Sequence, residues 1–307
     1  GSIVINARLF GDIIRKLPDS FVEIETDEDN NVYINCLNSK FKIKGDSAKE
    51  YPQIPDVNED KLYSIPQDVL KSMIKQTVFA TSQDQTKPIL MGELLEIENG
   101  NINLVAIDGY RFAVRSCQVD NLIHEDLKAK IIIPGKTLID VNSLLSSEEE
   151  VKVGFNEKNA IFIINDTKIV TRLLEGEFID YKKLCPREYN SKIKLKTKDL
   201  LNSIERASLL SQSEQNNLIK LSIRDSMMAI TSNNEKGNVY EEVALSLEGD
   251  YLDIAFNSRY LLEGLKNIDC EEIYIEFTTN VNPCIIKPAD GTKYTYLLLP
   301  VRISSNN

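Results

Sequence analysis

The chain has 307 residues and a formal net charge of −11, and this length predicts about two domains of roughly 150 residues each. No apolar run approaches the roughly 20 residues of a membrane-spanning helix, and no secretory signal is recognisable, which argues against a membrane-inserted or secreted protein. The five cysteines show neither a CxxC pair nor metal-ligand spacing, so we expect reduced thiols and a cytoplasmic protein.

The first predicted helix, residues 6–17, opens a unit that recurs along the chain. Leu9, Ile13 and Leu17 share one apolar face of this helix. Alternating apolar and charged residues then predict strands with one buried face, separated by a turn rich in Asn and Asp. These strands cover residues 21–26, 32–37 and 41–45.

The same order of helix, strand, turn and strand appears twice more, from helices predicted at 134–145 and 257–267. Arg8, Lys136 and Arg259 stand near the starts of the three helices. They recur about 125 residues apart, and a period of that size is a whole domain, too long for a solenoid unit. Further strands are predicted after the second and third helices, at 150–155, 160–164, 168–174, 272–277, 283–288 and 293–301.

A second kind of helix is predicted at 66–81 and again at 197–211, each after a short strand. The equivalent helix ahead of Asn6 is absent from the sequence, so we expect the chain to begin halfway through its first domain. The repeat therefore predicts two and a half domains, with boundaries near 55–61 and 186–192. We assign them to residues 1–58, 59–187 and 188–307.

The net negative charge argues, taken alone, against a nucleic-acid partner. The distribution changes this interpretation, because the predicted helices carry an excess of Lys and Arg while the strands and loops carry the acidic excess. A basic helical layer fits one face that meets a polyanion. The alternative is that Lys and Arg serve only as good helix formers on solvated faces.

The sequence predicts no catalytic residue, metal site or cofactor. His124, the only histidine, lies in a polar linker without a Ser or Cys motif beside it. No Gly-rich phosphate loop is present. Asp108 could serve a metal or act as a general acid, but Asp108-Gly109 between two strands is first of all a tight-turn signal.

Two short features remain to be explained. Arg111 lies between Tyr110 and Phe112 directly after that turn, and Pro300 interrupts the apolar stretch at 296–303. Because proline cannot donate to a central ladder, this stretch should lie at a sheet edge or boundary, where its side chains could line a peptide-binding groove. The alternative is that both features are core strands ending in a basic residue.

These segments together resemble the bacterial DNA polymerase III beta subunit, or sliding clamp. The resemblance extends from NARLFGDIIRKLP through SIPQDVLKSMIKQTVFATS and DGYRFAV to YTYLLLPVRI. It implies an α+β fold of repeated clamp-type domains, with helices on the inner face and antiparallel sheets on the outer face of a ring-shaped homodimer. It also implies a processivity factor in DNA replication that encircles duplex DNA without catalysis of its own.

The resemblance implies three sets of functional residues. Weak, sequence-independent contact with phosphates would come from basic residues of the inner helices and one loop. These DNA-facing residues are Arg8, Lys71, Lys75, Lys87, Lys136, Lys198, Arg206 and Arg259. The dimer interface would pair the first domain with the third domain of the other chain. Its apolar residues are Ile13, Leu17, Phe41, Leu209 and Leu210, although Ile13 and Leu17 fit a plain core equally well.

A pocket between the second and third domains would bind short peptides of the polymerase alpha subunit, the clamp loader and repair proteins. Tyr110, Ile107 and Ile179 depart from the residues usual in the family, which affects the peptide preference. The implied pocket residues are Leu90, Ile107, Gly109, Tyr110, Arg111, Phe112, Ile179, Lys183, Leu184, Leu297, Leu298, Leu299, Pro300, Val301 and Arg302.

Two other functions stay open. The acidic charge and the missing half-domain fit a clamp-fold adaptor that binds peptides but does not close around DNA. A metal-dependent hydrolase using Asp108 is a more distant alternative.

Overall fold

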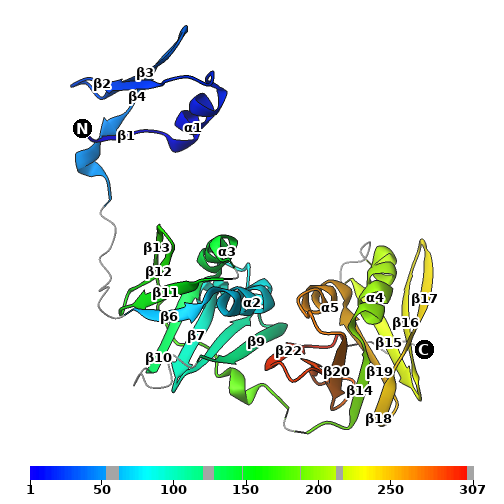
Figure 1. Ribbon diagram of the computed structural model, residues 1–307. Coiled ribbons are helices and arrows are strands. Elements are labelled where there is room, and N and C mark those ends of the chain that lie inside the picture. The colour runs from blue at the N-terminus through cyan, green and yellow to red at the C-terminus, as the bar shows by residue number, and fades with distance from the viewer. Residues whose placement is uncertain (53–61, 120–127, 147, 187, 212–216, 303–307) are drawn as a thin grey trace. The chain divides into compact units, whose positions relative to one another are not determined.

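The computed structural model describes residues 1–52, 62–119, 128–146, 148–186, 188–211 and 217–302 (Figure 1). The chain divides into two units, Gly1–Asp56 and Val57–Asn307. His124 and the predicted boundary at 55–61 lie outside the described residues.

The described part of the first unit contains one α-helix over a small sheet, as the sequence predicted. Asn6 caps α1, because its side-chain oxygen accepts a hydrogen bond from the backbone N–H of Leu9 at 2.9 Å. Ile13 of α1 packs with Val32 and Ile34 in the core of this unit. The elements are β1 (Ile3–Val4), α1 (Ala7–Lys16), β2 (Glu23–Thr26), β3 (Asn31–Cys36), β4 (Ser39–Lys44), β5 (Asp46–Ser47) and the 3-10 helix η1 (Ala48–Glu50).

The second unit contains two modules that follow one another along the chain. The elements of the first are β6 (Tyr63–Pro66), α2 (Gln67–Thr77), η2 (Val78–Ala80), η3 (Pro88–Met91), β7 (Gly92–Glu98), β8 (Asn101–Ile107), β9 (Arg111–Gln118), β10 (Lys128–Pro134), α3 (Gly135–Leu144), β11 (Glu150–Phe155), β12 (Asn159–Ile164) and β13 (Thr167–Arg172). After η5 (Tyr181–Lys183), the second has β14 (Ser191–Lys196), α4 (Thr197–Ser211), β15 (Leu218–Arg224), β16 (Met227–Asn234), β17 (Gly237–Ala244), β18 (Ser246–Gly249), β19 (Leu252–Asn257), α5 (Ser258–Leu265), β20 (Glu272–Phe277), β21 (Cys284–Pro288) and β22 (Tyr294–Leu298).

The strand order confirms that the modules are copies of one topology. The first module has a sheet ordered β13-β12-β11-β6, and the second repeats this order as β22-β21-β20-β14. In both, the strand before the first helix pairs with the strand after the second helix. The predicted helices and hairpins agree with the observed ones to within a few residues at their ends.

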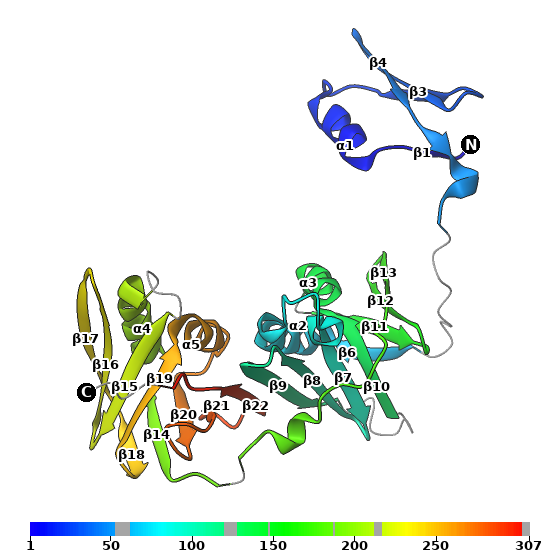
Figure 2. The same cartoon turned by 180° about the vertical axis from the view of Figure 1, so that it is seen from behind.

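A ladder between β9 and β22 joins the two modules into a nine-stranded antiparallel sheet, ordered β10-β7-β8-β9-β22-β21-β20-β14-β18. Helices α2, α3, α4 and α5 lie along one side of this unit in both views (Figures 1 and 2). Their apolar faces pack on the sheets: Met73 and Val141 in the first module, Ile204 and Leu261 in the second. This arrangement confirms the expected layers of helices and antiparallel sheets.

None of the helices within the described ranges combines the length and the apolar character that crossing a lipid bilayer would need.

Candidate functional site

An apolar groove lies where β9 and β22 join the two modules. Its volume is about 240 Å³. Ten residues line it, and nine of them were predicted from the sequence: Ile107, Gly109, Tyr110, Arg111, Phe112, Ile179, Leu184, Leu297 and Leu299; Pro283 is the tenth.

A tight turn between β8 and β9 sets one wall of the groove. The Asp108 carboxylate accepts hydrogen bonds from the backbone N–H groups of Tyr110, at 2.8 Å, and Arg111, at 3.0 Å. Gly109 has φ +99°, a left-handed conformation that glycine adopts without steric cost. Leu299 donates its backbone N–H to the carbonyl of Tyr110 at 2.9 Å, so the opposite wall is fixed to the same turn.

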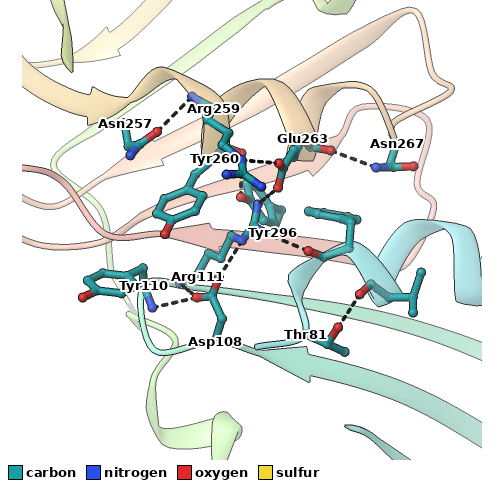
Figure 3. A network of polar contacts seen from close by, with 12 residues as sticks. Thr81, Asp108, Tyr110, Arg111, Asn257, Arg259, Tyr260, Glu263, Asn267 and Tyr296 are labelled. Carbon is teal, nitrogen blue, oxygen red and sulfur yellow. Dashed lines mark hydrogen bonds and ion pairs between the residues drawn. The ribbon is translucent and has the colours of Figure 1, made fainter. Parts of the chain in front are cut away.

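Arg111 supports this wall from behind, and its side chain is only 6% exposed. Its Nε donates to Asp108 at 2.9 Å, one terminal nitrogen to Glu263 at 2.6 Å, and the other to the Phe79 carbonyl at 2.9 Å (Figure 3). The guanidinium also lies over the Tyr260 ring, 4.5 Å from its centroid. Because every nitrogen of the guanidinium is engaged, Arg111 acts as a buried support and does not supply a free charge at the rim.

The electrostatics of Glu263 fit this arrangement. Burial alone would raise the pKa of its carboxyl group, but hydrogen bonds from Arg259 and Arg111 lower that pKa below its ordinary value. Glu263 is therefore ionised at neutral pH. Asp108 is committed to the turn and to Arg111, as the tight-turn interpretation predicted.

The remaining predicted groove residues lie around it. Leu90 is in the apolar cluster beneath the groove, whereas Leu298 packs in the core of the second module, because successive strand side chains point to opposite faces. Lys183 is 82% exposed and paired with Asp180. Val301 donates its N–H to the Ala255 carbonyl, so this residue lies beyond the β22 ladder, where Pro300 was expected to mark a sheet boundary. Pro300 is half-buried and Arg302 is exposed.

Three residues that shape this site were missed. Tyr260 stacks on Tyr110 with ring centroids 6.0 Å apart, Glu263 binds Arg111, and Pro283 lines the groove. Tyr260 and Glu263 belong to the third repeated helix, but no local signal shows that they meet a turn about 150 residues earlier.

The basic residues predicted to face DNA fall into two groups. Four have partners: Lys71 donates to the Leu145 carbonyl at 2.7 Å, and Lys75, Arg206 and Arg259 form ion pairs with Asp269, Glu241 and Glu263. The other four are exposed and form no ion pair with another described residue: Arg8, Lys87, Lys136 and Lys198.

The residues predicted for the dimer interface also fall into two groups, one in the core and one at the surface. Ile13 is 8% exposed and belongs to the core of the first unit, with Leu17 packed against it, so both serve the core there. Leu209 is 72% exposed and Phe41 39% exposed, and Leu210 is half-buried.

In the described part of the chain, no group of three or more His, Cys, Asp or Glu side chains is placed to hold a metal ion. Repeated modules with helices on one side, sheets on the other, and an apolar groove at the module junction define a clamp-type scaffold.

Comparisons with known proteins agree with this class. Models of the N-terminal, central and C-terminal domains of the DNA polymerase III beta subunit match residues 1–55, 64–180 and 182–302. The chain is 37% identical over 305 residues to the beta sliding clamp of Staphylococcus epidermidis strain RP62A, which covers 98% of this chain and 80% of the relative. It therefore belongs to the DNA polymerase III beta subunit family, the beta sliding clamps, and is a processivity factor of DNA replication.

Solved structures show the same relationship. A DNA polymerase sliding clamp from Bacillus subtilis superposes with a TM-score of 0.94 at 36% identity, covering 99% of this chain and 80% of that one. A putative DNA polymerase III beta subunit from Eubacterium rectale gives 0.93 at 32% identity, covering 99% and 82%.

Proposed function

We propose that this chain closes, as a homodimer, into a ring around duplex DNA and holds the replicative polymerase there through the groove between β9 and β22. The proposed chemistry is binding alone: a topological link supplies the retention, and no bond is made or broken. As a bacterial replication factor it would work in the cytoplasm, where the chromosome lies.

The observation that carries the proposal is the groove itself, which is apolar, fixed on both walls and largely pre-formed. Such grooves bind extended peptides through a few apolar side chains. The proposed occupants are short Leu- or Phe-containing segments of the polymerase alpha subunit, the clamp loader and repair proteins. We expect an affinity of about 1 μM, equivalent to about −8 kcal/mol.

The DNA contact rests on the exposed bases of the helices, with Arg8, Lys136 and Lys198 the strongest candidates. A few phosphate contacts attract DNA weakly enough to allow sliding. Each contact makes the slope of log K against log salt concentration steeper by about one. Lys75, Arg206 and Arg259 would contribute less, because an acidic neighbour offsets each charge.

A retention assay tests the ring. Protein loaded on nicked circular DNA should remain bound at a salt concentration that removes it from the same DNA after linearisation. Equal retention on both forms would contradict ring closure and would support the peptide-binding adaptor instead.

A pair of matched variants tests the groove. Leu299→Asp places a charge in the apolar wall and should weaken a fluorescent Leu/Phe-containing peptide at least about tenfold, since burying an unpaired carboxylate is costly. Met227→Asp is the control, because Met227 is 39% exposed against 38% for Leu299 and lies outside the groove. Equal affinities of the two variants in an anisotropy titration would contradict this groove.

A further inference from the structure

Glu263 is a carboxylate shared by two arginines with different surroundings. Its Oε2 accepts from Arg111 at 2.6 Å, and its Oε1 accepts from the Nε of Arg259 at 2.8 Å (Figure 3). Arg111 is buried behind the groove, whereas the side chain of Arg259 is 71% exposed on α5. The Glu263 carboxylate therefore connects Arg111 behind the groove wall with the exposed Arg259 on the helical side of this unit.

Helix α5 and the groove are also joined mechanically. The Tyr296 hydroxyl donates to the Tyr260 carbonyl of α5 at 2.8 Å. Tyr296 precedes Leu297 of the groove, and a Cβ on Gly264 would lie only 2.3 Å from the Tyr296 ring, so helix and strand are in close contact. Because this packing is close, a shift of Glu263 in α5 would be transmitted directly to the groove residue on β22.

The two arginines share one carboxylate, each through its own oxygen. Arg259 binds Glu263 through Nε alone, and its terminal nitrogens have no partner among the described residues. The hydrogen bond to Glu263 raises the pKa of Arg259, and the nearby positive charge of Arg111 opposes that rise. When another anion draws Arg259 away, Arg111 loses a neighbouring like charge and becomes the only arginine that offsets the charge of Glu263.

We propose that Glu263 couples the groove to the DNA-facing side: release of Arg259 leaves the carboxylate to Arg111, stiffens the groove wall and tightens peptide binding. The inference rests on the proposed function and adds a regulation to it. A phosphate group that engages Arg259 would supply the release, so a clamp on DNA would hold its partner more tightly than a free clamp.

Peptide binding to the full chain tests this coupling without DNA. Arg259→Gln, which lies outside the groove, should tighten a fluorescent Leu/Phe-containing peptide by about two- to fivefold, because a pre-organised wall loses less freedom on binding. Lys266→Gln is the matched control: it removes one positive charge from the end of the same helix, but Lys266 pairs with Glu205 at 2.8 Å and not with Glu263. It should leave the affinity unchanged.

A double-mutant cycle with Glu263→Gln tests whether the effect of Arg259→Gln depends on Glu263. In that background Arg259→Gln should have no further effect on the peptide, since the shared carboxylate is gone. An equal effect of Arg259→Gln with and without Glu263, or an equal effect of Lys266→Gln, would overturn the coupling.

Duplex DNA gives an independent readout. Added to the wild-type protein, it should lower the peptide Kd in the same direction as Arg259→Gln, and it should lose this effect in Arg259→Gln, because coupling between two sites is reciprocal. An undiminished DNA effect in Arg259→Gln would overturn the role of Arg259. A wild-type protein that fails to bind the peptide would instead contradict the groove itself, and the coupling with it.

Discussion

Glu93 places a carboxyl group inside the apolar core of the first module. It is fully buried on β7, on the same face as Leu95 and Ile97. Neither of its oxygens accepts a well-formed hydrogen bond, because the nearby Thr77 hydroxyl donates to the Met73 carbonyl and only partly offsets the effect of burial on the pKa of Glu93. Burial raises the pKa of Glu93 from 4.5 to about 8, so the carboxyl is mostly protonated at neutral pH.

This residue predicts a pH dependence of stability. Between pH 4.5 and about 8, Glu93 is protonated in the folded chain but ionised in the unfolded chain. The free energy of unfolding should therefore fall by up to about 1.4 kcal/mol per pH unit as the pH rises through this window. Glu93→Gln should remove that slope in urea titrations followed by circular dichroism.

The control for Glu93 lies on the same strand. Glu98 is 61% exposed and paired with Lys128, so Glu98→Gln should leave the slope as it is in the wild type. An unchanged slope in Glu93→Gln would show that the buried carboxyl does not titrate as inferred.

Arg111 shows how one buried charge can stabilise the junction of two modules. Arg111→Ala would remove the guanidinium donors to Asp108, Glu263 and the Phe79 carbonyl, and Glu263 would keep only Arg259 as a partner. Breaking a buried pair in this way costs about 3–5 kcal/mol, so the melting temperature should fall by several degrees. Arg206→Ala removes a pair in which the arginine is 55% exposed, and it should cost only about 0–1 kcal/mol. Similar losses in the two variants would contradict the supporting role of Arg111.

At the scale of elements, replacing a helical glycine by alanine should have opposite effects on stability in two helices. Replacing glycine by alanine inside a helix is favourable by up to about 1 kcal/mol. In α1, an added Cβ on Gly11 meets nothing within 4 Å, so Gly11→Ala should stabilise the first unit. In α5, the Cβ of Gly264→Ala would lie 2.3 Å from the buried Tyr296 ring, so this variant should be destabilised. A melting temperature of Gly264→Ala that does not fall would contradict the close packing of α5 on β22, and a fall for Gly11→Ala would contradict the open space beside Gly11.

The elements themselves were predictable because their signals are local. The apolar spacing of Leu9, Ile13 and Leu17 defines α1, and the alternation around Tyr274 and Ile275 defines β20. The burial of the Arg111 side chain behind the groove was not predictable, since its partner Glu263 lies on a helix about 150 residues away. The pairing of β9 with β22 likewise brings together strands with no shared local signal, and it is this pairing that creates the groove.

At the scale of the whole molecule, the edges of two sheets suggest how two chains meet. Among the described strands, β4 pairs only with β3, and β17 pairs only with β16. Unpaired edges invite further strand pairing. The side chains of Lys40, Lys42 and Lys44 are exposed along β4, and Glu242 is exposed on β17. The opposite charges fit a dimer in which β4 of one chain extends the β17 sheet of its partner.

Charge reversal tests this contact. Lys42→Glu, or Glu242→Lys, would set like charges against each other across the proposed edge and should weaken the dimer by about tenfold, equivalent to about 1.4 kcal/mol. The double variant restores opposite charges and should recover most of the loss, because the effect belongs to the pair. Lys158→Glu, in the exposed turn between β11 and β12, is the control for net charge. Sedimentation velocity across a concentration series measures the dimer affinity of the two single variants, the double variant and the control. A double variant that dimerises more weakly than either single variant would mean that these two edges do not meet.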